Sequence, residues 1–232
     1  MSDLNEAEVQ KQMAFLRERI LPAQRALIHA AAPLVEGSVT RDQYVKFMKQ
    51  VYYFSRETPR FLSCAAVRFP ESCERLRKWL LAHASEEAGH HLLALHDIRA
   101  LGDAEDLETG AALLVPTAGL VGWIYRTALL GDPLGVLGVS FIFEDLGARA
   151  GGTISRALQK AGIPRAACTY VSVHGEVDHG HNDEITKALQ QAIAAGASVS
   201  SIIHNAIASA SLYAAMVSEC FPTQRSASSP PS

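Results

Sequence analysis

The feature that most constrains this chain is a triplet of His174, Asp178 and His181, which have the spacing of one helix face. At about 100° per residue, the three side chains fall within a sector of roughly 60°. Apolar positions continue the same face: Tyr170, Val177, Ile185, Ala188 and Leu189. Such a face points into a core, where imidazoles and carboxylates are costly unless they are paired or bind a metal. The triplet therefore predicts a helical protein with a buried metal site.

Two upstream segments supply side chains of the same kinds. Glu87 and His90 are one helical turn apart on an otherwise apolar face, and Glu144 ends an apolar stretch. Small residues share the helix face of Glu144 and would let another helix or a metal approach closely: Ser140, Gly147, Ala148 and Gly151. Three carboxylates and three histidines on three helices fit two metal ions better than one, because helical bundles hold carboxylate-bridged metal pairs in this way.

Two neighbouring residues leave the ligand set open. His83, Glu87 and His90 repeat the spacing of the downstream triplet, so His83 is either an additional ligand or a partner of one. Glu86 lies four residues before His90 and is an alternative to Glu87. Nitrogen and oxygen ligands without a thiolate favour iron or manganese over structural zinc.

The composition predicts one nearly neutral cytoplasmic domain. The chain has 232 residues, with 21 Lys and Arg against 24 Asp and Glu. No basic block indicates nucleic acid, and no apolar stretch is long enough to span a bilayer. The first residues are polar and acidic, unlike a secretory signal. The four cysteines lack CxxC spacing, so we expect reduced thiols.

The hydrophobic pattern is helical almost throughout and predicts a single all-α domain of seven or eight helices over residues 1–221. Residues 222–232, rich in Ser and Pro, predict a disordered tail.

Three details of the predicted helices bear on the site. Pro22 predicts a break or kink in a first helix over about 5–35. One helix over about 71–101 carries Glu87 and His90. Gly151 and Gly152 predict a break or bend after Glu144.

Together the three motifs resemble those of the heme-oxygenase-like diiron oxidases and oxygenases. That family shares its fold with heme oxygenase, thiaminase II and the pyrroloquinoline-quinone synthase. The resemblance covers roughly residues 10–220 and rests on Glu87-x2-His90, Glu144 followed by Gly-rich residues, and the triplet, in that order.

The resemblance implies a heme-oxygenase-like helical bundle with two Fe(II)/Fe(III) ions per chain and O2 as co-substrate. It assigns one set of side chains to each iron. The first set is Glu87, His90 and His174, and the second is Glu144, Asp178 and His181.

The implied activity is O2-dependent oxidation of a small amino-acid-like or fatty-acid-like substrate in specialised biosynthesis, by N-oxygenation, oxidative decarboxylation or C–C cleavage. An electron donor and a homodimer are compatible with it; nucleic acid and membrane are not expected partners. Candidate pocket residues are the aromatics Trp123, Tyr125, Phe141, Phe143 and Tyr170, with Arg149 as a cation for a substrate carboxylate.

Other proteins of this fold provide alternatives. A heme oxygenase would use His29, the only N-terminal histidine, and a thiaminase would use Cys168, but each leaves most of the motif residues unexplained. A cofactor-free quinone-synthase-like oxidase would need a cation-rich pocket, which the helical pattern does not indicate. That oxidase and a non-catalytic metal-binding or interaction protein stay as alternatives.

Overall fold

The computed structural model describes residues 5–104 and 107–222, and within these all side chains except those of residues 148 and 176–180. The described residues form ten α-helices and three short 3-10 helices and contain no β-strand, so the all-α class is confirmed. The α-helices are α1 (Glu6–Ala30), α2 (Ala32–Glu36), α3 (Arg41–Ser55), α4 (Thr58–Ala66), α5 (Glu74–Glu86), α6 (His90–Ala100), α7 (Val115–Leu129), α8 (Val136–Lys160), α9 (Thr169–Ala194) and α10 (Val199–Cys220). Apart from Pro222, the tail predicted over 222–232 lies outside the described residues.

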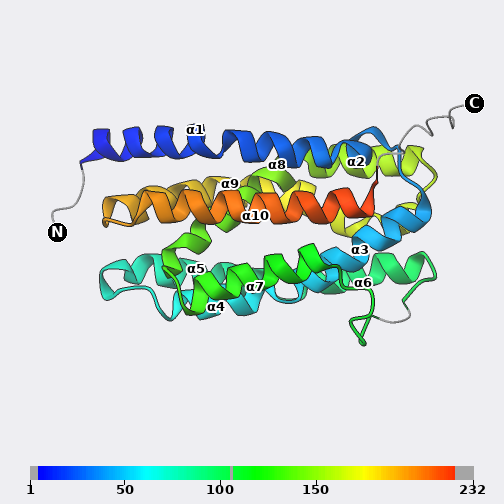
Figure 1. The fold of residues 1–232 in the computed structure, drawn as a ribbon, viewed down its shortest axis with the longest axis horizontal. Helices are drawn as coiled ribbons and strands as arrows, with labels where there is room; N and C mark the ends of the chain where they lie inside the picture. Colours follow the sequence, from blue (N-terminus) through cyan, green and yellow to red (C-terminus); the bar gives the residue numbers. More distant parts are fainter. Residues whose placement is uncertain (1–4, 105–106, 223–232) are drawn as a thin grey trace, which may run out of the picture.

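The helices are arranged in layers along one long axis (Figure 1). The long helices α1, α9 and α10 run lengthwise in one part of the molecule, and α4 to α7 form a separate layer beside them. The contacts that shape the site are α8 along α9, α10 against both α1 and α8, and α3 against α6.

The helix expected over 71–101 is interrupted at the motif itself, which is one reason why the helices outnumber the prediction. α5 ends at Glu86, α6 begins at His90, and Gly89 between them has a φ of +100°. A residue in the left-handed region just after a helix is a common stop signal, and glycine adopts it without steric cost. Glu87 and His90 therefore lie at the junction of two helices.

At two other positions, where the sequence predicted a break or a change of direction, the helix continues unbroken. α1 continues through Pro22, which is exposed, so water can satisfy the carbonyl group that loses its partner. α8 continues through Gly151 and Gly152 because these glycines serve a close helix contact. A Cβ atom on Gly151 would lie 2.5 Å from the Cα of Gly175 in α9.

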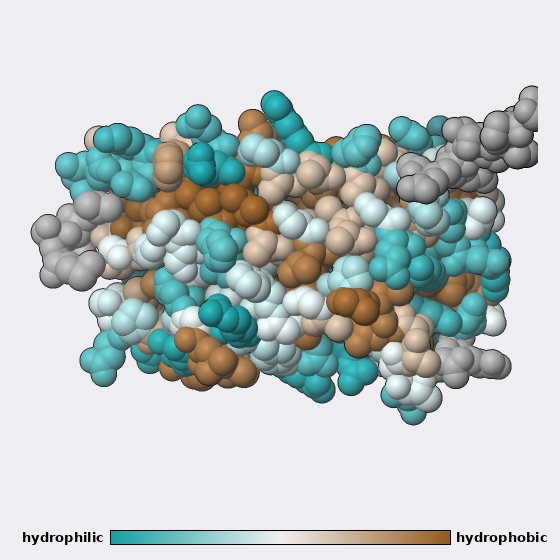
Figure 2. Space-filling view, viewed as in Figure 1, coloured by the Kyte–Doolittle hydropathy of each residue, from teal (hydrophilic) through white to brown (hydrophobic). Residues whose placement is uncertain are grey.

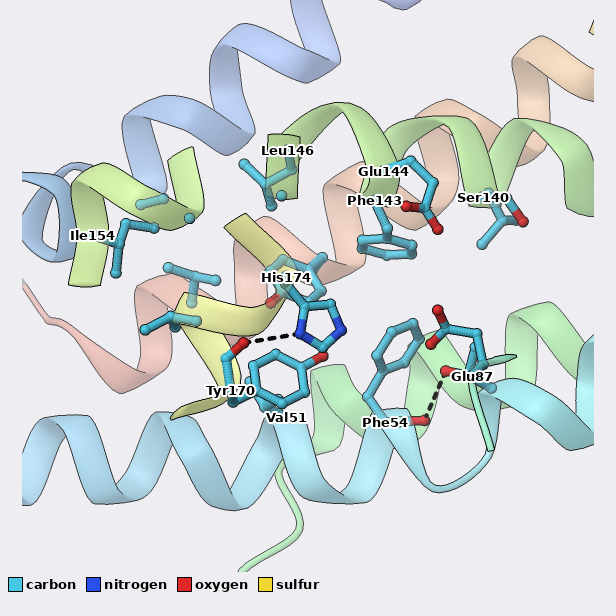
Figure 3. A pocket seen from close by; sticks show the side chains of 18 of the residues that line it. Val51, Phe54, Glu87, Ser140, Phe143, Glu144, Leu146, Ile154, Tyr170 and His174 are labelled. Carbon is cyan, nitrogen blue, oxygen red and sulfur yellow. Dashed lines mark hydrogen bonds between the residues drawn. The ribbon is translucent and has the colours of Figure 1, made fainter. Parts of the chain in front are cut away.

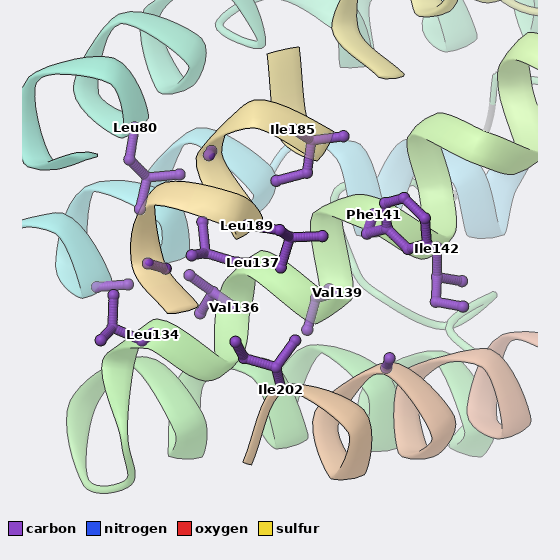
Figure 4. Close-up of a cluster of buried hydrophobic side chains, with 14 of the residues drawn as sticks. Leu80, Leu134, Val136, Leu137, Val139, Phe141, Ile142, Ile185, Leu189 and Ile202 are labelled. Atoms are coloured by element: carbon purple, nitrogen blue, oxygen red, sulfur yellow. The ribbon is translucent and has the colours of Figure 1, made fainter. Parts of the chain in front are cut away.

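Buried side chains form two apolar cores. In the first, α5, α8, α9 and α10 meet through side chains such as Leu80, Leu137, Leu189 and Ile202 (Figure 4). The second lies among α2, α3, α6 and the later parts of α8 and α10. The face shown in Figure 2 is largely hydrophilic, with an apolar strip along the seam between α1 and α10. No helix in the described ranges is long and apolar enough to cross a membrane.

Candidate metal centre

One group of potential metal ligands is centred on Glu144. His83, Glu87, Glu144 and His181 each offer a ligand atom within 4.8 Å of the others. The carboxylate of Glu144 in α8 lies between two imidazoles: Oε1 is 3.3 Å from Nε2 of His83 in α5, and Oε2 is 3.3 Å from Nδ1 of His181 in α9. His83, Glu87 and Glu144 are buried. Three segments far apart in the sequence thus converge on one point.

A second group shares Glu87 with the first. Glu87, His90 and His174 also offer ligand atoms within 4.8 Å of one another. Nδ1 of His90 is 3.1 Å from Oε2 of Glu87, and the rings of His90 and His174 are 4.8 Å apart between centroids. Because Glu87 belongs to both groups, it is the natural bridge between two adjacent positions.

The surroundings of the imidazoles suit metal ligation. Metal-binding histidines usually donate the second ring N–H to a carbonyl or carboxylate, which orients the ring. His174 can donate Nδ1–H to the carbonyl of Tyr170 at 2.9 Å, which leaves Nε2 with a free lone pair. Glu86 lies outside the first group, 3.5 Å from Nε2 of His181 and 4.0 Å from Nδ1 of His83.

A buried nitrogen adds to this fit. Nδ1 of His83 has no hydrogen-bond partner within the described part of the chain, and the ring of Trp79 stacks on the imidazole at 5.4 Å between centroids. Leaving such an atom unsatisfied is costly, and a shift of the half-exposed Glu86 side chain by about 1 Å would satisfy it. The residues present therefore fit a pair of carboxylate- and imidazole-bound metal ions.

The contacts of Glu144 with two histidines favour its ionised form. Burial acts to raise its pKa, but hydrogen bonds and charge interactions with His181 and His83 outweigh burial and lower the pKa to about 2. The hydrogen bond to Glu87 raises the pKa of His90 against the effect of burial, whereas burial lowers the pKa of His174. A carboxylate that stays ionised and an imidazole that stays neutral are both ready to bind a cation.

The sequence did not decide whether His83 and Glu86 are metal ligands, and it predicted that Asp178 is one. The structure brings His83 into the group of Glu144 and places Glu86 just outside that group. Asp178 lies on α9, but its side chain lies outside the described part of the structure, so its part in the site stays a prediction.

A cavity of about 140 Å3 adjoins these side chains. Figure 3 shows Glu87, Glu144 and His174 reaching it from three different segments, with the rings of Phe54 and Phe143 beside them. The remaining lining is mostly apolar and comes from both cores, for example Leu34, Phe47, Val51, Ile154 and Val217. Among the described residues that line this cavity there is no Lys or Arg.

Two of the six expected pocket residues, Phe143 and Tyr170, line this cavity. The other four lie elsewhere, because each has packing or polar partners away from it. Phe141 is buried in the first core, Tyr125 donates a 2.7 Å hydrogen bond to Glu57, and Trp123 donates one of 3.1 Å to Asn205.

Arg149, the fourth of these residues, lines a separate cavity and pairs with Asp145 at 2.7 Å. The two residues are four positions apart, about one turn of α8, and Asp145 is buried.

Several lining residues were not found from the sequence. Val51 and Phe54 in α3 and Tyr213 in α10 lie on helices that carry none of the ligand motifs. Their apolar spacing is that of ordinary core residues. Only the packing of α3 against α6 and α10, and of α10 against α8, brings them to the cavity.

Residues 45–214 match the family of iron-containing redox enzymes. The chain belongs to this family. This chain, which has two overlapping groups of carboxylates and imidazoles, thus belongs to a family whose description names iron.

Solved structures show the same fold. A domain of unknown function with a heme oxygenase-like fold from Shewanella denitrificans is 21% identical and has a TM-score of 0.71, with 94% of this chain and 92% of that chain covered. A TenA homologue from Pseudomonas syringae is 12% identical, with a TM-score of 0.73 and 90% and 92% covered. A TenA family transcription regulator from Silicibacter is 15% identical, with a TM-score of 0.56 and 89% and 96% covered. No curated protein matches the sequence significantly.

Proposed function

We propose that this iron-containing redox enzyme is a non-heme diiron oxidase or oxygenase that uses O2 to oxidise a small substrate. The observation that carries the proposal is the sharing of Glu87 between two ligand groups, since one metal ion would not require both. Bundles with carboxylate-bridged metal pairs use the same side-chain types on facing helices.

The protein's own residues would have distinct roles. Glu87 would bridge the two irons, His90 and His174 would complete one site, and Glu144 and His181 the other. Asp178 and His83 are further proposed ligands of the second site, in which Glu144 contacts two imidazoles. When bound, the iron pair would supply the electrons and the Lewis acidity for O2 activation.

The cavity favours an apolar substrate over a zwitterionic one. A free amino acid would need partners for both of its charges, and burying an unpaired charge is costly. The described part of the lining offers two carboxylates but no Lys or Arg, and most of its other residues are apolar. We therefore propose a hydrocarbon portion in this cavity, as in a fatty-acid-like substrate. The lack of cations also weighs against the cofactor-free quinone-synthase-like alternative.

Metal content and O2 consumption test this function. Anaerobically loaded wild-type protein should hold about two Fe(II) per chain and consume O2 on exposure. His174→Ala should retain roughly one iron, whereas Glu87→Ala should retain less, because its carboxylate serves both positions. Glu184→Ala is a matched control, since this exposed acid near the site bonds to Trp79 and belongs to neither group.

Two results would contradict the proposal. Equal iron content in Glu87→Ala and wild type would remove the bridge. Two bound irons without O2 consumption, with or without decanoate as a trial acid, would favour the non-catalytic metal-binding alternative.

A further inference from the structure

A second cavity lies on the other flank of α8. It measures about 210 Å3 and is enclosed by α1, α2 and α8. Leu146 lines both this cavity and the first one, so the two cavities are adjacent at its side chain. The second cavity is therefore next to the candidate metal centre but has a different lining.

Helical geometry explains the position of Leu146. Taking Glu144 as the origin, Gly147 and Gly151 lie at about −60° and −20° around α8 and line the first cavity. Arg149 lies at about 140° and lines the second, and Leu146 lies at about 200°, on the boundary. Rotation of this one side chain, without backbone movement, is the only change that a passage at Leu146 would require of α8.

Arg149 is held at the second cavity by a buried acid. Its Nε atom donates a 2.7 Å hydrogen bond to Oδ1 of Asp145, and Gln24 donates to Oδ2 at 2.9 Å. Both carboxylate oxygens of Asp145 are thus occupied. The side chain of Arg149 is 69% exposed, and its two terminal nitrogens make no hydrogen bond to the described residues. These nitrogens have the fork geometry that binds a carboxylate.

Positively charged side chains become more frequent from the first cavity, through the second, to the third. A third cavity shares Val35 and Thr153 with the second and is lined by Arg156 and Lys160 as well as one acid, Glu36. Arg149, Arg156 and Lys160 have the seven- and four-residue spacing of one face of α8. The residues described around the first cavity include no Lys or Arg. This gradient suits an anion with an apolar chain.

We propose that the second cavity binds the acid group of an amphiphilic organic anion through Arg149, and that the apolar chain passes Leu146 into the first cavity. The occupant class is a monocarboxylate with a hydrocarbon chain. In this arrangement the chain, rather than the acid group, lies beside Glu87 and Glu144. That the anion is the substrate rests on the proposed function, but the binding site itself does not.

Binding of decanoate to the metal-free protein tests the site independently of iron chemistry. Calorimetry would compare decanoate, below its micelle-forming concentration, with uncharged decanol. Arg149→Gln should weaken decanoate binding about tenfold and leave decanol binding unchanged, because of the two ligands only decanoate makes a charge-assisted contact with Arg149. Arg156→Gln is the matched control: it removes the same charge from the same helix face outside the second cavity, and its effect should stay within about twofold.

Leu146→Trp tests the passage. Its larger side chain should weaken both decanoate and decanol, with an unchanged circular dichroism spectrum showing that the fold is intact. The proposal is overturned if the wild type does not bind decanoate, if Arg149→Gln binds it as tightly as the wild type, or if that variant loses decanol equally. Failure of the protein to load iron would instead contradict the proposed function and leave these binding results in force.

Discussion

The contact between α8 and α9 at Gly151 should be highly sensitive to substitution. A Cβ atom there would lie 2.5 Å and 2.7 Å from Cα and N of Gly175, and 3.0 Å from the carbonyl oxygen of Val171. All three atoms belong to the backbone of α9, so no side-chain rotation relieves the contact. Gly151→Ala must therefore push the two helices apart.

The cost can be estimated from these distances. Ordinary carbon–carbon contacts are about 3.5–4.0 Å, so the helices must separate by about 1 Å. Overpacking costs about 1–3 kcal/mol, and three backbone contacts place this case near the upper end. Replacing a helical glycine by alanine returns about 1 kcal/mol. We expect a net loss of about 2 kcal/mol, or roughly 4–8 °C in Tm for a chain of this size.

The adjacent glycine provides the control. A Cβ atom on Gly152 would meet only the flexible end of Arg156, at 3.6 Å, so Gly152→Ala should gain up to about 1 kcal/mol from helix propensity. Urea unfolding of both variants without metal would measure the difference, expected at about 3 kcal/mol. Similar stability of the two variants would refute the argument from close backbone contact.

The same substitution should affect metal binding. Glu144 lies on α8 and His174 on α9, so separating the helices by about 1 Å displaces ligands that must hold their distances within about 0.2 Å. Gly151→Ala should therefore bind Fe(II) at least tenfold more weakly than Gly152→Ala. Equal affinities would show that the close contact between α8 and α9 does not position the ligands.

Two further outcomes follow from single carboxylates. Asp97 of α6 is buried, and its carboxylate accepts hydrogen bonds from the backbone N–H groups of Thr169 and Tyr170 at 3.0 and 2.8 Å. Asp97→Asn places an amide donor against one of these N–H groups. We expect this variant to lose about 1–3 kcal/mol of unfolding free energy in urea and to keep the iron content of the wild type. Burial opposes ionisation of Glu144, but its two imidazole partners lower its pKa in the folded protein to about 2, from 4.5. Its folded-state pKa is depressed, so the stability that it contributes is present above about pH 4.5 and is lost as the pH falls toward 2. The stability difference between the metal-free wild type and Glu144→Gln should accordingly shrink across that window, and a constant difference from pH 6 to pH 3 would contradict the assigned contacts.

Helical periodicity made much of the site accessible from the sequence. The spacing of His174 and His181 placed both on one face of a helix, and the structure brings each of them to a ligand group with carboxylates from other segments. Helical periodicity could not show which of these residues belongs to which of the two ligand groups. His83 shares a face with Glu87 in the sequence, and only the packing of α5 against α9 places it beside Glu144 and His181.

The cavity was less predictable for a related reason. A side chain such as Val51 has the same local pattern whether it fills a core or lines a space. The distinction depends on how closely α3 approaches α8, which is a property of the folded chain. Polar residues were misplaced for the same reason: Trp123 and Tyr125 were predicted to line the pocket as aromatic residues, but Asn205 and Glu57 bind their polar groups elsewhere.

The helix prediction was wrong at two glycines, in opposite ways, and both glycines shape the site. Gly89 has open space around it but a φ of +100°, so the backbone conformation requires glycine and the helix stops there. Gly151 lies inside a regular helix, so glycine is required only because α9 leaves no room for a side chain. The sequence predicted a continuous helix through Gly89 and a break or bend at Gly151. The first turns the chain so that Glu87 stands at the junction of α5 and α6, where it serves both ligand groups, and the second brings the helices of Glu144 and His174 together. The bridging position of Glu87 thus depends on a glycine that ends a helix, and the approach of its partners depends on one that does not.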